Sequence, residues 1–475
     1  MKKALFVISV PGQVPELRAL AIELKKREEY LPYFYFNRAL PTADVLADFT
    51  AHGIPTFAWN KRLVPWGFPD QLGQAREKSP VITDANRIGF FTPIKAYLRR
   101  FLGALFYLPR LRWRIKLERN FLHREKFSQL ILAEDSFDYH TPTLIRLGRE
   151  LNLPTVIFPY TLADAQEFAE GAYVCKNFLW KPQYFFISVL FPKWVRFHRA
   201  RRVVKSSAHL ILANEYLGTS PPNPWVMNSG RADRIAVESP YMFDYYRNAG
   251  ISESQLSLTG FASLDRLAEE LERRDARKKE LYEIHGFDPA LPLMLCSVLP
   301  TQAPRRFLDP QFRDYEDFLE KYAVILRSWS GMNVLFKFHP RVKPEDYSAL
   351  CARLNLQVTP DETTSLIPAC DVFIASVSAT IRWALLCGKP VINFDAYGYR
   401  YKDFKDAPGL LVAETLPELE FQLEKILDPE RRASLKEELA PKKSYWGVAD
   451  GKSVDRILEL FKELETTPAA QSQNN

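Results

Sequence analysis

The residues best suited to chemistry lie in the last third of the chain, where an apolar run at residues 334–338 leads into a histidine. Lys337 lies near the end of this predicted strand, His339 follows it, and Arg341 comes two residues later. Ligands of open α/β sheets bind at the carboxyl ends of strands. A cation or a donor imidazole at such an end stabilises the negative charge of a leaving phosphate. We therefore predict a catalytic role for His339 and phosphate binding by Lys337 and His339.

A second apolar run, residues 369–375, ends in three hydroxyl residues, Ser376, Ser378 and Thr380. They precede a predicted helix at residues 381–387, and backbone N–H groups and hydroxyls at a helix N-terminus attract phosphate. The same hydroxyls would also serve as an ordinary helix cap. Ser297 and Thr301 lie at and beyond the end of a third predicted strand, residues 293–298. We expect all five residues to contact a nucleotide.

Three motifs in this region occur in the order Lys-x-His-Pro (337–340), Asp-Val-x-Ile-x-Ser-x-Ser (371–378) and Gly-Lys-Pro-Val-Ile-Asn-Phe-Asp (388–395). From about residue 258 onward, the chain resembles the second half of GT-B glycosyltransferases. The likeness is closest to bacterial capsule and teichoic-acid enzymes, including CDP-glycerol glycerophosphotransferases and the transferases that use CMP-sialic acid or CMP-Kdo. The resemblance implies two Rossmann-like domains facing a central cleft. It also implies a nucleotide-activated donor, with a cytidine nucleotide favoured, and no separate cofactor.

Transfer to a hydroxyl acceptor needs a general base, which the resemblance assigns to the first domain. The favoured candidates are Glu134 and Asp135, because they end the most apolar strand of that half, residues 128–133. They resemble the acidic pair of bacterial sialyltransferases, although Ser136 stands where a glycine would follow. A surface acidic pair is the plain alternative. The other candidate bases are at predicted strand ends or nearby: Glu215 after residues 209–213, Glu238 after residues 234–237, and His140.

Strand and helix signals alternate along the chain, which is the α/β pattern. A length of 475 residues suits two domains of ordinary size. We predict an acceptor-side domain at residues 1–265, a charged linker helix at 266–288 and a nucleotide-binding domain at 289–445. A C-terminal helix at 446–465 is expected to cross back to the first domain, and residues 466–475 are expected to be a disordered tail.

The cysteines and the apolar runs indicate the cellular location of the protein. Five scattered cysteines without a CxxC pair favour a reduced, cytosolic protein and argue against a zinc site. The apolar run 4–10 is too short for a signal peptide and is followed by Pro11-Gly12, so it is predicted to be the first strand. No run of about eighteen apolar residues occurs, so the sequence predicts no transmembrane helix.

The net charge of +7 is concentrated in two basic, aromatic-rich segments. Residues 95–126 hold ten Lys or Arg and two Glu, and residues 176–205 hold eight Lys or Arg and no acid. Both are predicted to be helical insertions in the first domain. Basic residues interleaved with aromatics are typical of helices on anionic lipid, so we expect a peripheral protein on the inner face of the cell membrane. The alternative is that both segments cover the core of the first domain. No recognisable nucleic-acid-binding fold accompanies the charge, so nucleic acid is not the expected partner.

Three functions compete. The first is a metal-independent transferase that moves a sugar or glycerol phosphate to a surface polysaccharide or lipid-linked acceptor, since no DxD-type metal motif stands at a plausible site. The second is a sugar-nucleotide 2-epimerase of the same fold, which would carry Ser-Gly-Gly and paired glutamates where this chain has Ser-Val-Ser-Ala-Thr-Ile-Arg-Trp-Ala (376–384). The third is a non-catalytic scaffold of a polysaccharide assembly complex.

Overall fold

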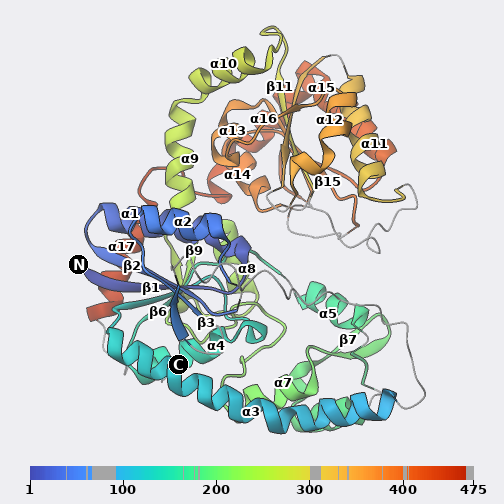
Figure 1. Cartoon of the computed structure of the whole chain (residues 1–475). Helices are drawn as coiled ribbons and strands as arrows, with labels where there is room; N and C mark the ends of the chain where they lie inside the picture. The colour runs from blue at the N-terminus through green and yellow to red at the C-terminus, as the bar shows by residue number, and fades with distance from the viewer. Residues whose placement is uncertain are drawn as a thin grey trace. The chain divides into compact units, whose positions relative to one another are not determined.

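The computed structural model divides the chain into two compact units, which are drawn in Figure 1. The first unit comprises residues 1–237, 243–261 and 454–475, and the second comprises 238–242 and 262–453. The described residues are 1–38, 40–59, 63–66, 92–163, 165–175, 177–179, 182–299, 312–329, 331–339, 342–376, 378–398, 404 and 406–466.

The first unit is built on an eight-stranded sheet of order β10-β9-β6-β5-β1-β2-β3-β4. Its strands are β1 (Lys2–Ile8), β2 (Tyr30–Phe36), β3 (Thr56–Trp59), β4 (Leu63–Trp66), β5 (Gln129–Leu132), β6 (Thr155–Ile157), β9 (Arg234–Val237) and β10 (Leu256–Leu258). Every pairing is parallel except that of β4 with β3. Strand β1 pairs with both β2 and β5, so the strand order reverses at β1. Such a reversal is where open α/β sheets bind ligands.

Helices at both ends of the chain cover this sheet. Helix α1 (Val14–Lys26) has Pro15 in its first turn and buries the stripe Leu17, Leu20, Ala21 and Leu24. The C-terminal helix α17 (Ser453–Thr466) packs into the same unit. The Phe461 ring meets the Tyr30 ring edge-on at 5.6 Å, and the Phe461 carbonyl accepts a 3.1 Å hydrogen bond from the Gln129 amide. Helices α2 (Ala43–Ala51), α4 (Thr141–Glu150) and most of α8 (Pro240–Asn248) also belong to this unit.

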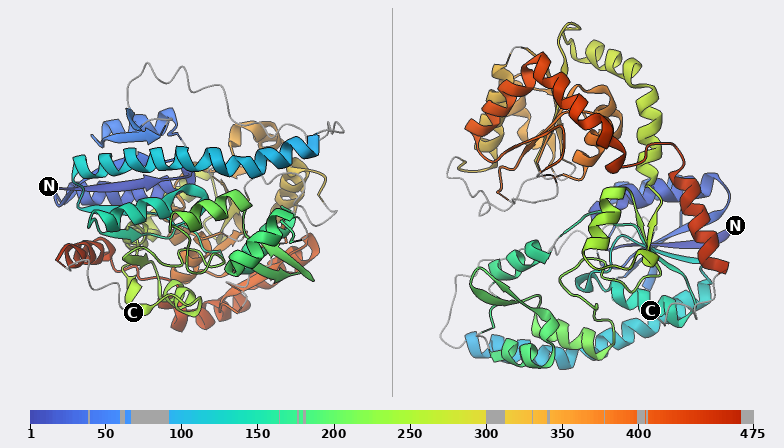
Figure 2. Two further views of the ribbon diagram at one scale, coloured as in Figure 1. Left: turned by 90° about the horizontal axis from the view of Figure 1, so that it is seen from below. Right: turned by 180° about the vertical axis from the view of Figure 1, so that it is seen from behind.

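The two basic segments form an insertion in the first unit, shown from two further sides in Figure 2. The first segment is the helix predicted, α3 (Thr92–Glu125), which packs beside α7 (Ala208–Tyr216). The second is only partly helical: α6 (Pro182–Leu190) is followed by an antiparallel hairpin of β7 (Val195–His198) and β8 (Arg201–Val204). Helix α5 (Ala165–Val174) packs on that hairpin.

The strand predicted at residues 209–213 is wrong, because these residues lie inside helix α7. A five-residue apolar run has no periodicity that separates a buried strand from a buried helical turn. Ile211 and Ala213 are buried here between α3 and the α6 region. Glu215 therefore lies in a helix and not at a strand end.

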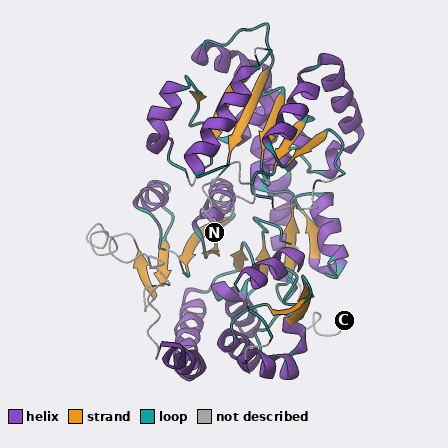
Figure 3. Cartoon of the chain, turned by 90° about the vertical axis from the view of Figure 1, so that its right-hand side faces the viewer, coloured by secondary structure: helices purple, strands orange, loops and turns teal. Residues whose placement is uncertain are grey.

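The second unit holds a six-stranded, fully parallel sheet of order β13-β12-β11-β14-β15-β16, with its strands drawn in orange in Figure 3. The strands are β11 (Leu293–Val298), β12 (Asn333–Phe338), β13 (Gln357–Val358), β14 (Val372–Ala375), β15 (Val391–Phe394) and β16 (Leu410–Ala413). Here the order reverses at β11, which pairs with both β12 and β14. Buried clusters on both faces explain why these strands are continuous apolar runs.

The helices of the second unit are α9 (Ala262–Glu272), α10 (Arg274–His285), α11 (Tyr315–Ser328), α12 (Ser348–Arg353), α13 (Thr363–Ala369), α14 (Thr380–Leu386), α15 (Leu416–Leu427) and α16 (Pro429–Leu439). Both α9 and α10 pack against α13. The units therefore differ from the boundaries predicted at residues 265 and 289, because the charged segment 266–288 buries Leu267 and Leu281 in the core of the second unit.

Candidate functional site

The predicted acidic pair lies where the strand order of the first unit reverses. Glu134 and Asp135 follow β5, and the register Val7↔Leu132 brings them level with Ser9, just after β1. Both side chains are buried. This excludes the plain alternative of a solvated surface pair.

Glu134 is held by a residue that follows β1. The Gln13 side-chain nitrogen donates a 2.6 Å hydrogen bond to Oε1 of Glu134. The Gln13 oxygen accepts the backbone N–H groups of Ser9 and Val10 at 2.7 and 3.3 Å, which fixes the orientation of the amide. Burial, reinforced by the charge of Asp135, raises the pKa of Glu134 to about 8. Glu134 is therefore a neutral acid at pH 7 and can donate a proton.

Asp135 has a different set of partners. Its backbone N–H donates to Oδ1 of Asn228 at 2.9 Å, and Nδ2 of Asn228 donates to the Tyr246 hydroxyl at 2.8 Å. Asn228 is fully buried in the left-handed region at φ +57°, which asparagine tolerates better than most residues. Burial raises the pKa of Asp135 to about 6, and backbone N–H groups of Gly230 and Asn228 limit the rise. At neutral pH Asp135 is thus ionised yet basic enough to accept a proton.

Two environments push these neighbouring carboxyl groups to different protonation states. Such a divided pair is what separate acid and base roles require. Burial raises both pKa values, and the charge of Asp135 adds to the rise for Glu134.

The rival base candidates have structural partners. Glu215 accepts hydrogen bonds from Trp194 and Ser220 at 2.6 and 2.5 Å and pairs with Lys193 at 3.1 Å. Burial alone would raise the pKa of Glu215, but these bonds outweigh it and the pKa is lowered. Glu238 forms a buried ion pair with Arg382 within the second unit.

The third rival, His140, is enclosed in a buried cluster. Its Nε2 lies 2.8 Å from Glu118, which also contacts Arg114 and Tyr35. Burial lowers the pKa of His140, and the Glu118 charge opposes this effect. Although burial alone would raise it, His140 and Arg114 hold the pKa of Glu118 at about 2. The cluster ties α3 to β2 and to the start of α4.

In the second unit, the predicted phosphate ligands lie at the carboxyl ends of the parallel strands. Ser297 and Lys337 are direct register partners on β11 and β12, and His339 follows β12, half-buried. The Lys337 ammonium, however, donates to the Pro360 carbonyl at 2.7 Å, beyond β13. Burial lowers the pKa of Lys337, against the charges of Asp361 and Glu362. The Lys337 ammonium is therefore already hydrogen-bonded within the protein.

The hydroxyl residues after β14 differ from one another. Ser378 and Thr380 bond each other at 2.8 Å, and Ser378 also accepts the Thr380 backbone N–H at 3.3 Å, so both serve the start of α14. The Ser376 hydroxyl is buried and has no hydrogen-bond partner. A buried unsatisfied hydroxyl costs free energy unless a ligand or water meets it. Ser376 thus has the strongest structural case for phosphate contact. Thr301 lies outside the described residues.

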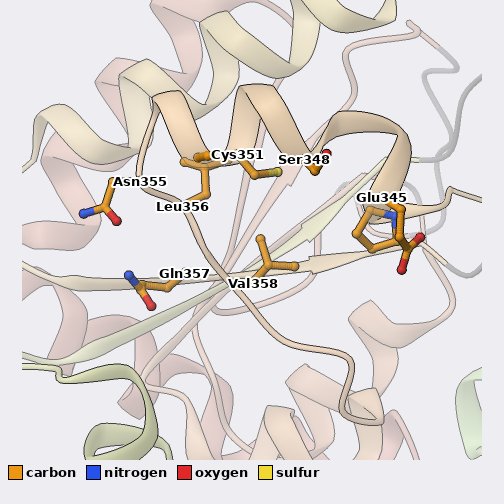
Figure 4. A pocket seen from close by; sticks show the side chains of 9 residues that line it. Glu345, Ser348, Cys351, Asn355, Leu356, Gln357 and Val358 are labelled. Atoms are coloured by element: carbon orange, nitrogen blue, oxygen red, sulfur yellow. The ribbon is translucent and has the colours of Figure 1, made fainter.

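A shallow pocket of about 460 Å³ lies elsewhere in the second unit, between α12 and β13 (Figure 4). Its lining includes Glu345, Ser348, Cys351 and Gln357. None of the predicted nucleotide ligands lines it. We do not assign this pocket to the predicted chemistry, because it lies at the β13 edge and away from the reversal at β11.

Metal-binding side chains do not cluster in the described part of the chain: no group of three or more His, Cys, Asp or Glu there has the arrangement to hold an ion. Two site residues were missed from the sequence, Gln13 and Asn228. Gln13 follows Pro11-Gly12 after the first predicted strand, which was the available signal. Asn228 lies 93 residues from Asp135 and carries no local signal.

No protein-family model and no curated protein sequence matches this chain. Solved structures do match it over nearly its whole length. The calicheamicin glycosyltransferase CalG4 gives a TM-score of 0.54 at 12% identity, covering 98% of each chain. UDP-GlcNAc 2-epimerase from Neisseria meningitidis, bound to UDP-GlcNAc, gives 0.51 at 11%, covering 97% of this chain and all of its own. The wall teichoic acid polymerase TagF gives 0.51 at 11%, covering 98% and 89%. These likenesses establish the fold, a GT-B arrangement of two Rossmann-like domains.

Proposed function

We propose that this chain is a glycosyltransferase, or a glycerophosphotransferase, that uses a nucleotide-activated donor. The observation that carries the proposal is the buried Glu134–Asp135 pair at the reversal point of the first sheet. Its two pKa values, about 8 and about 6, lie on either side of neutrality, as proton transfer at neutral pH requires. The fold shared with glycosyltransferases and a teichoic acid polymerase supports this assignment.

In this proposal the second unit binds the donor. Ser376 contacts a donor phosphate through its unsatisfied hydroxyl, and His339 neutralises charge on the leaving nucleotide. Ser297, Ser378 and Thr380 are nearby polar groups at the same end of the sheet. The sequence resemblance favours cytidine, whereas the Neisseria neighbour holds UDP-GlcNAc. Both bases belong in the binding screen.

The first unit supplies the base. Asp135 removes the proton of an acceptor hydroxyl while the oxygen attacks the donor carbon or phosphorus. The bond between that centre and the nucleotide breaks, and the electron pair leaves on the nucleotide phosphate. Asp135 ends protonated and the nucleotide leaves as an anion. No metal or cofactor enters this scheme.

The acceptor we propose is a surface polysaccharide or lipid-linked saccharide at the inner face of the cell membrane. In the described part of the chain, no helix has the length and apolar character of a membrane span. A surface of exposed large apolar side chains, which we name the apolar patch, instead suits peripheral contact. Its members lie on α6 and β7, with exposures from 58 to 69%: Phe185, Phe186, Val189, Leu190 and Phe197.

Charge decides which partner this patch fits. Exposed Arg196, Arg201 and Arg202 lie on the same hairpin, and residues 176–205 contain no acid. Aromatic and aliphatic side chains beside arginines match an anionic lipid surface. On helix α3, Arg110, Arg112 and Lys116 are exposed as well, whereas Arg114 is bonded to Glu118 and Tyr35.

Vesicle sedimentation tests this contact. The double variant Phe185→Ser, Phe186→Ser should lose most binding to vesicles containing phosphatidylglycerol, and binding by the unaltered chain should weaken with salt. Tyr216→Ser, which removes an exposed aromatic of α7, is the matched control and should keep its binding. Equal partition of double variant and control would leave a protein partner or a second copy as the occupant of the patch.

The transferase itself is tested by nucleotide binding and then by turnover. A thermal-shift screen against CMP, CDP, UDP and GDP identifies the nucleotide, since ligands stabilise the folded state by mass action. Asp135→Asn should then bind that nucleotide normally and lose at least ~100-fold in turnover, the lower end of what one positioned base contributes. Binding without any turnover by either form would contradict the proposal.

A sugar-nucleotide 2-epimerase is the second candidate, favoured by the matching Neisseria structure. Incubation of the purified protein with UDP-GlcNAc and no acceptor separates the two, because an epimerase needs no acceptor. Appearance of the C2 epimer would replace the transferase. Absence of any nucleotide binding would instead favour a non-catalytic scaffold.

A further inference from the structure

Three charged side chains lie around the carboxyl pair of the first unit without an ion partner. Arg38 follows β2, Asp138 lies in a short 3-10 helix (Phe137–Tyr139), and Lys205 follows β8. Within the described residues, none of the three has a salt bridge within 4.0 Å. Their charges nevertheless act on one another: Asp138 interacts with both cations, and Asp138 and Arg38 both interact with Glu134. They therefore surround one small region.

The two cations rest on aromatic rings. The Lys205 nitrogen lies 2.7 Å from the centroid of the Phe168 ring and 5.8 Å from that of Trp225. The Arg38 guanidinium carbon lies 4.9 Å from the centroid of Tyr139. A ring face attracts a cation but accepts none of its N–H bonds as an oxygen would. Both side chains are therefore held in place with donors to spare.

Partial burial shifts the pKa of both Asp138 and Lys205. The Asp138 side chain is exposed to solvent, yet desolvation by surrounding protein raises its pKa. Lys205 is half-buried, and burial lowers its pKa to about 7 against the charge of Asp138.

Three buried polar atoms near the carboxyl pair have no hydrogen-bond partner. They are the Ser9 hydroxyl, the Asn37 side-chain oxygen and the Ser229 hydroxyl. Ser9 and Asn37 follow β1 and β2, and the Asn37 N–H bonds the Ile8 carbonyl at 3.0 Å. Ser229 neighbours Asn228, which holds the Asp135 backbone. Because these unsatisfied polar atoms lie near the candidate base, they indicate that a polar ligand binds there.

We propose that this region is the acceptor subsite and that it selects an acceptor carrying an anionic group, a phosphate or carboxylate, which Lys205 and Arg38 bind. The hydroxylated part of the acceptor lies against Asp135, with Ser9 and Asn37 as hydrogen-bonding partners. This inference rests on the proposed transferase function, since it names the acceptor class for the same base.

Calorimetric titration with sn-glycerol 3-phosphate, using glycerol as the uncharged reference, tests the subsite. We expect the phosphate compound to bind and glycerol not to bind measurably. Lys205→Met should weaken phosphate binding at least tenfold, and Arg38→Met by a smaller factor. The control Lys26→Met, a solvated lysine of α1 in the same unit, should change it less than twofold.

A second measurement needs no variant. The lowered pKa makes the Lys205 amine more reactive than ordinary lysines toward acetic anhydride at pH 7.5. Mass spectrometry should show early acetylation of Lys205 and its suppression by glycerol 3-phosphate.

The outcomes separate this inference from the proposed function. No preference for the phosphate compound over glycerol, or equal binding by Lys205→Met and Lys26→Met, would overturn the subsite. If Lys205→Met weakened nucleotide binding to the same degree, the cations would belong to the donor phosphate and the acceptor assignment would fall. Phosphate binding at Lys205 without any nucleotide binding would keep the subsite and remove the transferase.

Discussion

The side-chain amide of Gln13 donates a 2.6 Å hydrogen bond to the carboxyl group of Glu134, across 121 residues of sequence. The bond joins the chain after β1 to the chain after β5, the two strands between which the sheet order reverses. The amide oxygen is occupied by the Ser9 and Val10 N–H groups, so only its nitrogen can face Glu134. This geometry leaves Glu134 one hydrogen-bond donor, too few to offset the burial that keeps it protonated.

The first prediction concerns stability and pH. A buried acid whose pKa is raised on folding stabilises the folded state below its unfolded pKa, and this contribution is lost as the pH rises through the folded value. For Glu134 that window runs from about 4.5 to about 8. The free energy of unfolding should therefore fall by a few kcal/mol, on the order of 1.4 per pKa unit, across this range. Urea denaturation at several pH values measures it.

Glu134→Gln should flatten that profile, because the amide does not titrate. Glu253→Gln, an exposed residue of the same unit, should leave the slope unchanged. A slope that persists in Glu134→Gln would mean that another group, Asp135 first among them, is responsible.

The second prediction concerns Gln13. Gln13→Leu removes the acceptor of two backbone N–H groups, one of them in the buried Ser9, and should cost ~1–3 kcal/mol for each group left unsatisfied. It should also raise the pKa of Glu134 further, since the Gln13 bond lowers it. Gln13→Glu keeps an acceptor oxygen but adds a carboxyl group beside Glu134. Its stability should approach that of the unaltered protein at pH 5 and fall steeply toward pH 8. Similar stability loss for both variants at both pH values would contradict this account.

The sequence predicted much of this site and missed what holds it together. The strands before Glu134 and Ser376 could be predicted, because strands buried on both faces are continuous apolar runs. Once these strands were located, the polar residues at their carboxyl ends could be predicted as site residues. The Gln13–Glu134 bond could not be predicted, because it depends on which strands become neighbours.

The sequence also could not show which candidate ligands are already hydrogen-bonded to other residues of the protein. Lys337 and Ser378 have the residue types of phosphate ligands, and their bonds to Pro360 and Thr380 are visible only in three dimensions. Glu238 followed a correctly predicted strand, yet its ion pair with Arg382, 144 residues away, gives it a structural role.

The third prediction concerns that ion pair. The Glu238 and Arg382 side chains are 3 and 6% exposed, so removing one partner leaves a buried charge uncompensated. Glu238→Gln should destabilise the protein by ~3–5 kcal/mol. The double variant Glu238→Leu, Arg382→Met should recover most of that loss, since replacing both charges by apolar groups is often neutral. Denaturation monitored by circular dichroism gives the three values.

An exposed pair in the same unit provides the control for this experiment. Arg266 and Glu362 lie 2.5 Å apart with side-chain exposures of 48 and 63%, and Glu362→Gln should change stability by less than ~1 kcal/mol. If Glu238→Gln behaved like Glu362→Gln and abolished turnover, Glu238 would return as a candidate base.

The fourth prediction concerns Ser376, where stability and binding should move in opposite directions. Its buried hydroxyl has no partner, so Ser376→Ala removes an unsatisfied polar group and should leave the ligand-free protein as stable or slightly more stable. If that hydroxyl meets a donor phosphate, the same change should weaken nucleotide binding about tenfold, the worth of one hydrogen bond to a charged group.

Ser378→Ala is the matched control for Ser376→Ala, two residues along the same loop. It loses the hydroxyl that accepts the Thr380 N–H at the start of α14, so it should cost ~1 kcal/mol of stability. Its nucleotide affinity should change little, because that hydroxyl is already bonded to Thr380. Thermal unfolding with and without the nucleotide found in the screen measures both quantities for each variant. Weakened affinity in Ser378→Ala together with unchanged affinity in Ser376→Ala would transfer the phosphate contact from Ser376 to the helix start.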